Sequence, residues 1–173
     1  QGAELGVFGN MTAPETTVSG SLIVNSGASA QTEDLTVESG ATLDFNATFA
    51  ITKPVAQPRK AAKIQGTVLL GQDAQLDGDM LLESLSEVPA LLEGTGQITG
   101  HVMAGAAILS PGNSPGTLSL GGLTVGDGAI LDLEVRDATG VAGVDYDQLS
   151  VAGDLTNEGT FTTPTVIQLT SLD

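Results

Sequence analysis

Hydrophobic and polar residues alternate along most of this chain, which is the pattern of β-strands that bury one face. The clearest run is Leu131-Asp132-Leu133-Glu134-Val135-Arg136, with three aliphatic residues on one face and three charged residues on the other. Similar runs recur at short intervals, so we predict many short strands separated by turns. The other inward-facing positions that we predict are Val18, Leu22 and Val24; Leu35 and Val37; Leu43 and Phe45; Ile64, Val68 and Leu70; Ile98 and Val102; Leu118 and Leu120; Leu149, Val151 and Leu155; and Val166, Ile167 and Leu169.

A short corner sequence recurs between these runs and leads each time into an apolar strand. Its glycine can adopt the positive φ of a sharp turn, and its alanine is small enough to point into the interior. Successive glycines of these corners lie 13, 65 and 23 residues apart, which favours an irregular unit of roughly 20 residues. The corners are Ser26-Gly27-Ala28, Ser39-Gly40-Ala41, Ala104-Gly105-Ala106 and Asp127-Gly128-Ala129.

Two segments interrupt the alternation. Lys53–Lys63 contains two prolines and four of the five basic residues, and because proline cannot donate to a strand ladder we predict a loop or a sheet edge there. Met80–Leu92 has leucines spaced more as in a helix, although Pro89 argues against a long one. This second segment is either a short helical insertion or two strands around a turn.

The composition favours an all-β fold. The 173 residues include 23 glycines but only 3% aromatic residues, so the core must be assembled from Val, Leu, Ile and Ala with many corners between strands. We predict a single domain over residues 1–173, a β-solenoid of about seven or eight turns that rises ~4.8 Å per turn to a height of roughly 35 Å. The alternative is a β-sandwich or jelly roll, which also uses evenly spaced short strands.

The charge balance limits the partners. There are 21 acidic and 5 basic residues, a formal net charge of −16. Such a surface repels nucleic-acid phosphates and anionic lipid headgroups, so we expect neither as a partner, but it can collect divalent cations. The chain has no cysteine, which excludes disulfides and thiolate chemistry, and no apolar run approaches the ~20 residues of a membrane span. The start at Gln1-Gly2-Ala3, without Met, suggests a secreted product whose leader has been removed.

Three motifs follow one another in the second half of the chain: Gly94-Thr95-Gly96-Gln97-Ile98-Thr99-Gly100, then Ser110-Pro111-Gly112-Asn113-Ser114-Pro115-Gly116-Thr117-Leu118, then Tyr146-Asp147-Gln148-Leu149-Ser150-Val151-Ala152-Gly153. In this order they resemble the β-strand repeat region of bacterial autotransporter passengers and related large surface proteins, over roughly residues 90–160. The resemblance implies a right-handed parallel β-helix, export across the bacterial envelope and a role at the cell surface.

The second motif also has a direct physical interpretation. Pro111 and Pro115 fix φ, and the glycine after each accepts the turn that the proline begins. Asn113 and Ser114 can bond their own backbone in tight turns. We therefore predict a rigid corner between neighbouring strands at this motif.

Carboxylates two residues apart on a strand share one face, where they could bind calcium or form a glycosidase-like pair. We interpret Asp132 and Glu134 as a solvated outer face. The remaining pairs lie nearer turns, where oxygen ligands converge more easily, and they are the candidate Ca²⁺ ligands; we expect no other cofactor. These ligands are Asp77, Asp79, Asp145 and Asp147. The single histidine, His101, cannot build a transition-metal site or a catalytic triad alone, and we expect it to be exposed on a strand.

We predict that the protein is not an enzyme. β-Helix polysaccharide lyases use Lys or Arg bases beside calcium-binding carboxylates, whereas here only Arg136 lies on a predicted strand face. The other basic residues, Lys53, Arg59, Lys60 and Lys63, form either a solvated loop or a self-association contact with the acidic face of a second copy.

The ends of a solenoid expose unpaired strand edges, and Thr165–Leu172 reads as such an open strand. We therefore expect a structural cell-surface or extracellular-matrix protein that self-assembles into a fibre. The alternative is an adhesin module that binds a glycan or a host surface.

Overall fold

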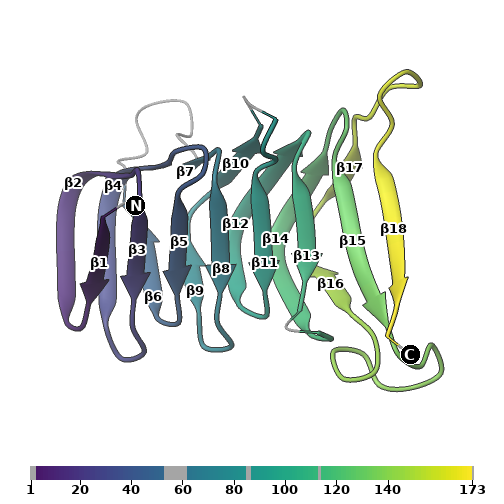
Figure 1. The fold of residues 1–173 in the computed structure, drawn as a ribbon, viewed down its shortest axis with the longest axis horizontal. Coiled ribbons are helices and arrows are strands. Elements are labelled where there is room, and N and C mark those ends of the chain that lie inside the picture. The colour runs from purple at the N-terminus through teal and green to yellow at the C-terminus, as the bar shows by residue number, and fades with distance from the viewer. Residues whose placement is uncertain (1–2, 53–61, 85–86, 113, 173) are drawn as a thin grey trace.

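The computed structural model describes residues 3–52, 62–84, 87–112 and 114–172, and every regular element in these residues is a β-strand (Figure 1). The strands form two sheets. The eight-stranded sheet contains, in spatial order, β1 (Glu4–Val7), β3 (Ser21–Val24), β5 (Thr42–Phe45), β8 (Thr67–Leu70), β11 (Leu91–Gly94), β13 (Ile108–Pro111), β15 (Ile130–Val135) and β18 (Val166–Ser171). The ten-stranded sheet contains β2 (Asn10–Val18), β4 (Ser29–Val37), β6 (Thr48–Ile51), β7 (Ala62–Ile64), β9 (Gln75–Asp77), β10 (Met80–Glu83), β12 (Gln97–Gly105), β14 (Thr117–Val125), β16 (Gln148–Val151) and β17 (Leu155–Asn157).

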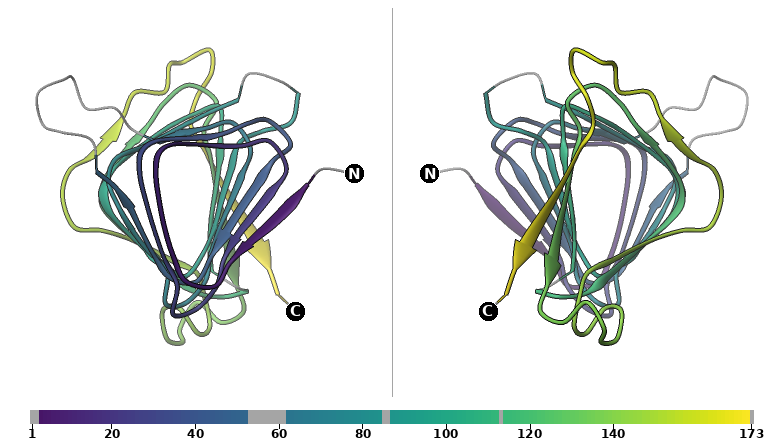
Figure 2. Two further views of the ribbon diagram at one scale, coloured as in Figure 1. Left: turned by 90° about the vertical axis from the view of Figure 1, so that its left-hand side faces the viewer. Right: turned by 90° about the vertical axis from the view of Figure 1, so that its right-hand side faces the viewer.

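All pairings between these strands are parallel. The predicted all-β fold is therefore confirmed, and the jelly-roll alternative, which needs antiparallel strands, is wrong. The strands of the eight-stranded sheet follow one another in chain order, because the chain visits the ten-stranded sheet between each strand and the next. We call one such passage a circuit; viewed along the long axis, successive circuits overlie one another (Figure 2).

The circuits differ in length, as the irregular spacing of the corners predicts. Glu4 lies opposite Ser21, 17 residues further on, whereas Ile130 lies opposite Val166, 36 residues further on. The ten-stranded sheet also varies from one circuit to the next. Three nine-residue strands each pair with two short strands of a neighbouring circuit. β4 pairs with β6 and β7, β12 pairs with β9 and β10, and β14 pairs with β16 and β17. The gap between each two short strands marks a bend in this sheet.

The core between the sheets consists of apolar columns that follow the strand register. Burial of each such side chain contributes about 1.5–3 kcal/mol, and together these columns hold the two sheets against each other. One column on the eight-stranded sheet, at most 4% exposed, is formed by Leu22, Leu43, Val68, Leu92 and Leu109. The facing column on the ten-stranded sheet is formed by Ala30, Phe49, Leu76, Ile98 and Leu120.

Three of the four predicted glycine–alanine corners are confirmed. Gly27, Gly40 and Gly128 have φ values of 78°, 76° and 72°. The alanine that follows each of them is buried. The fourth prediction is wrong by one residue, because Gly105 ends β12. Ala106 adopts the positive φ of 47° there, and Ala107 fills the buried position.

The structure also decides between the alternatives for the two interruptions. Met80–Leu92 supplies β10 and the start of β11, so it forms two strands around a connection, and the helical insertion is wrong. Most of the basic segment, including Lys53, Arg59 and Lys60, lies outside the described residues. Lys63 lies within β7, which pairs with β10 on one side and β4 on the other, so this residue is in neither a loop nor a sheet edge and the prediction is wrong here.

Candidate functional site

The carboxylate of Asp147 joins parts of the second and third sequence motifs. Asp147 is only 7% exposed. Its Oδ1 accepts a hydrogen bond from Gly116 N at 2.8 Å, and its Oδ2 accepts one from Glu134 N at 2.7 Å. The backbone adds two bonds of 2.8 Å, from Asp147 N to Glu134 O and from Gln148 N to Gly116 O. One side chain therefore ties β15 and the start of β16 to the corner after β13.

The corner follows the sequence prediction at the glycine after Pro111, but Gly116 does not adopt a positive φ and Ser114 does so in its place. Gly112 and Ser114 have positive φ values of 106° and 63°, and the chain then enters β14 at Thr117. A Cβ on Gly112 would overlap Asp147 Oδ1, so this position needs glycine for space as well as for conformation. The rigid corner and the buried carboxylate form one structural unit.

Burial raises the pKa of Asp147 above its ordinary value of 3.8. The hydrogen bonds from Glu134 N and Gly116 N oppose that rise in the pKa, while the negative charges of Glu134 and Asp132 add to it. Asp132 Oδ1 is itself buried and has no hydrogen-bond partner within the described residues. Asp132 lies on the outward side of β15 as predicted and is half-buried, but its Oδ1 is not solvated. The carboxylate on which the charge of Asp132 acts is that of Asp147, which is 15 positions away in the sequence.

Two of the predicted calcium ligands, Asp77 and Asp79, accept different hydrogen bonds. Asp77 Oδ1 accepts from Gln75 Nε2 at 2.8 Å and from Thr99 Oγ1 at 3.1 Å. Asp79 lies after β9 and accepts from His101 N at 2.8 Å through its Oδ1. The side chains therefore support the neighbouring circuit individually.

The other predicted pair is divided in the same way. Asp145 Oδ2 accepts from Val141 N at 2.8 Å within the loop between β15 and β16, whereas Asp147 bonds two other segments. Across the part of the chain that the structure describes, no three His, Asp or Glu side chains gather closely enough to hold a metal ion. Calcium binding stays a prediction, which the melting temperature with and without millimolar Ca²⁺ would test; no shift would remove the hypothesis.

A polar groove crosses four successive circuits at the bend of the ten-stranded sheet. Its lining residues include Asp79, Thr99, His101, Gly121 and Asp154, and its volume is about 370 Å³. His101 is half-buried rather than exposed, and its Nε2 lies 2.9 Å from Thr124 Oγ1. Sequence reasoning therefore missed the setting of this histidine.

Glycines keep the groove open. A Cβ on Gly100 would overlap Gly78 O, one on Gly121 would overlap Thr99 O, and one on Gly153 would approach Gly121 O at 2.5 Å. The backbones of successive circuits therefore pack closely along this column of glycines, and a larger side chain at these positions would have no room. The sequence signal that could have found this column is a glycine in the middle of otherwise regular strands.

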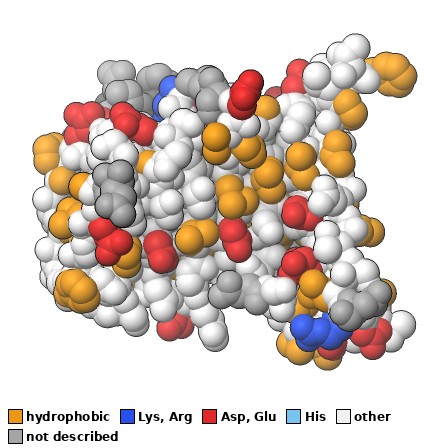
Figure 3. Space-filling model, viewed as in Figure 1, with side chains coloured by type: hydrophobic (Ala, Val, Ile, Leu, Met, Phe, Trp, Pro, Cys, Tyr) orange, Lys and Arg blue, Asp and Glu red, His pale blue; other side chains and the backbone are white. Residues whose placement is uncertain are grey.

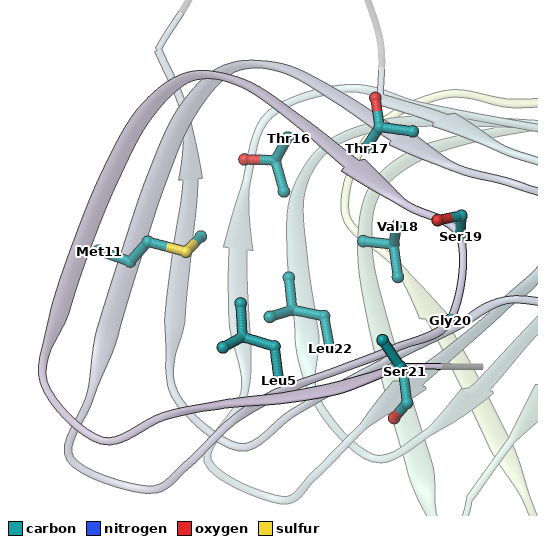
Figure 4. Close-up of a pocket in the computed structure, with 10 residues that line it drawn as sticks. Leu5, Met11, Thr16, Thr17, Val18, Ser19, Gly20, Ser21 and Leu22 are labelled. Atoms are coloured by element: carbon teal, nitrogen blue, oxygen red, sulfur yellow. The ribbon is translucent and has the colours of Figure 1, made fainter. Parts of the chain in front are cut away.

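The N-terminal end of the core contains an apolar cavity of about 190 Å³ (Figure 4). Leu5, Met11, Val18 and Leu22 contribute its apolar lining. Thr16 also lines the cavity, and its Oγ1 is buried without a hydrogen-bond partner among the described residues. Leu5 continues the column of Leu22 through the register of β1 and β3, but it is 60% exposed because β1 has no neighbour on its other side in the described chain.

The opposite end exposes the matching edge. β18 extends the same column through the pair Leu131 and Ile167, and it has β15 as its only described neighbour. Ile167 and Leu169 are 64% and 68% exposed, and Leu155 of β17 is 65% exposed. The predicted strand near the C-terminus is confirmed, and its outer edge has no partner strand within the described residues.

Of the four residues predicted for self-association, Lys63 is described. Its Nζ lies 3.1 Å from Glu83 Oε1, and both side chains are partly exposed. A surface ion pair of this kind contributes ~0.2–1 kcal/mol, so Lys63 helps to join β7 to β10 only weakly.

None of the described residues forms a helix that is long and apolar enough to cross a membrane. No protein-family model matches the chain, and neither a curated protein nor a solved structure is significantly similar to it. The candidate sites are therefore interpreted from their own geometry.

Proposed function

We propose that this chain is a structural module of a secreted bacterial cell-surface or extracellular-matrix protein, built as a right-handed parallel β-helix of the autotransporter-passenger type. The observation that carries the proposal is the continuous column from Leu22 to Leu109, which places one buried aliphatic residue on each of five consecutive strands. Such stacking extends in one direction by nearest-neighbour contacts, as in other repeat proteins, and suits a stiff spacer. Export and the surface location rest on the three sequence motifs.

The module also self-associates through its ends. Unpaired parallel edges attract further strands, and natural proteins normally cover or blunt such edges. β18 is the last strand of the eight-stranded sheet and follows the circuit that contains β16 and β17. No described strand of the ten-stranded sheet follows β16 and β17, which leaves room beside them for an added strand. β16, β17 and β18 contain no charged residue, so this edge escapes the repulsion expected between copies with a net charge of −16.

Sedimentation velocity at rising protein concentration tests this association. The wild-type protein should shift to larger species, and the double variant Ile167→Thr/Leu169→Thr should shift less, because threonine keeps strand propensity but removes apolar contact. Val144→Thr is the matched control, since Val144 is 58% exposed in the loop before β16. A wild-type protein that stays monomeric at every concentration would contradict end association.

We infer that the module is not catalytic and needs no cofactor for its structural role. Asp147, Asp145, Asp79 and Asp77 each accept hydrogen bonds that brace a turn or a neighbouring circuit. These contacts give the carboxylates a structural role that does not require a reaction. Hydrolysis or elimination of any polysaccharide in a panel of uronate and neutral glycans would contradict this inference.

The second candidate is an adhesin module that binds a glycan. The observation that favours it is the polar groove, where Asp79, His101 and Asp154 lie on three of the four circuits that the groove crosses and could bond sugar hydroxyls. A glycan array followed by titration of Asp154→Ala tests it. Loss of a wild-type glycan signal in this variant would favour the adhesin, whereas the absence of any wild-type signal would remove it.

A further inference from the structure

The outer face of the eight-stranded sheet changes character along one row of residues. In the N-terminal strands the row is formed by hydroxyl residues, Ser21, Thr42 and Thr67, as expected for a face in water. In the next four strands the same row becomes aliphatic. These residues are Leu91, Ile108, Ile130 and Val166.

This aliphatic row lies outside the core. Leu91, Ile108 and Ile130 are half-buried while the next residue along each strand points inward, and Val166 is 45% exposed. Apolar side chains gather on the C-terminal half of this face, with acidic side chains beside them (Figure 3). Contiguous exposed apolar residues rimmed by polar ones mark interaction surfaces more often than isolated exposed residues do.

An acidic pocket adjoins the row. Leu69 lies directly between Asp44 and Glu93 in the register of β5, β8 and β11, so the two carboxylates stand ~10 Å apart across it at the ordinary strand spacing. These three residues, with Gly71 and Gly94, line a cavity of about 230 Å³. Neither carboxylate has a hydrogen bond or ion pair within the described part of the chain.

We propose that this face, Leu69 and the aliphatic row together with Asp44 and Glu93, docks a basic amphipathic segment of another protein. The carboxylates of Asp44 and Glu93, which have no side-chain partner among the described residues, fit Lys or Arg side chains, and the aliphatic row fits the apolar residues of the same segment. The net charge of −16 attracts such a segment over a distance. A second copy in the same orientation would instead bring its own acids against these acids.

The proposal does not depend on end association. It is tested with a labelled 12-residue peptide of alternating Lys and Leu, whose binding is measured by fluorescence anisotropy at 150 mM NaCl. We expect the double variants Ile108→Thr/Ile130→Thr and Asp44→Asn/Glu93→Gln each to weaken binding at least tenfold. A peptide of alternating Lys and Ser should bind the wild-type protein at least tenfold more weakly, because it lacks the apolar face.

Two control variants separate this face from general charge and folding effects. Met103→Thr removes an apolar side chain that is 39% exposed on the other sheet, and Glu15→Gln removes a distant exposed carboxylate; both should bind within twofold of wild type. Circular dichroism confirms that each variant is folded. Equal binding by the wild type and both double variants would overturn the proposal. So would a wild-type dimer that Ile108→Thr/Ile130→Thr abolishes, because a second copy would then occupy the face.

Discussion

Replacement of Leu92 by alanine tests the column architecture directly. Leu92 is fully buried, and the column residues on its two neighbouring strands are Val68 and Leu109. Deletion of a buried leucine side chain costs 2–5 kcal/mol, because the lost burial is joined by an unfilled cavity, and we expect about 3 kcal/mol here. At ~2–4 °C per kcal/mol for a chain of this size, the melting temperature should fall by about 6–12 °C.

The adjacent Leu91 is the matched control. It is the same residue type on the same strand, but it points outward, so Leu91→Ala should cost less than ~1 kcal/mol. Both values come from urea unfolding followed by circular dichroism. If Leu92→Ala costs no more than Leu91→Ala, the assignment of inward and outward faces is wrong, and with it the argument for a stacked core.

Three further predictions concern the Asp147 contacts and the glycine column. Asp147→Ala should lower the free energy of unfolding in urea by about 3 kcal/mol, because it leaves Gly116 N and Glu134 N without their acceptors. The control Asp73→Ala, in an exposed turn, should lower it by less than ~0.5 kcal/mol. Equal costs for the two variants would refute the structural role of Asp147. Burial raises the pKa of Asp147, so the folded protein holds this proton more strongly than the unfolded chain, and the contribution is complete below about pH 3.8 and lost as pH rises through the folded pKa. The stability of the wild type relative to Asp147→Asn should therefore fall as the pH rises above about 3.8, and a rise would mean that the hydrogen bonds outweigh burial. Gly100→Ala should destabilise the fold by about 2 kcal/mol or more, because the new Cβ would overlap Gly78 O. The control Gly9→Ala, with open space around the position, should change stability by less than ~1 kcal/mol. Similar melting temperatures for the two variants would contradict the close packing of circuits.

The strands and most corners could be predicted because their signals are local. Alternation of apolar and polar residues fixes which face of a strand is buried. Gly27 and Gly40 indicate turns because glycine readily adopts the positive φ that they have in the structure. The spacing of these two glycines was harder to interpret. They are successive corners at the two ends of β4, so their separation of 13 residues measures part of a circuit rather than a whole one.

The candidate sites depend on contacts between circuits, which leave little trace in local sequence. Asp147 bonds Gly116 and Glu134, which precede it by 31 and 13 residues, so no short motif connects them. Asp145 and Asp147 accept hydrogen bonds from different segments, because both lie in a loop where the strand period does not apply. The aliphatic row from Leu91 to Val166 is visible only once the register is known.

Electron microscopy of the purified protein at rising concentration tests the central claim most directly. A stacked structural module that associates through β18 and β1 should appear as rods of constant width whose length grows with concentration, and Ile167→Thr/Leu169→Thr should shorten them. Compact particles of one size at every concentration, unchanged by that variant, would contradict the account.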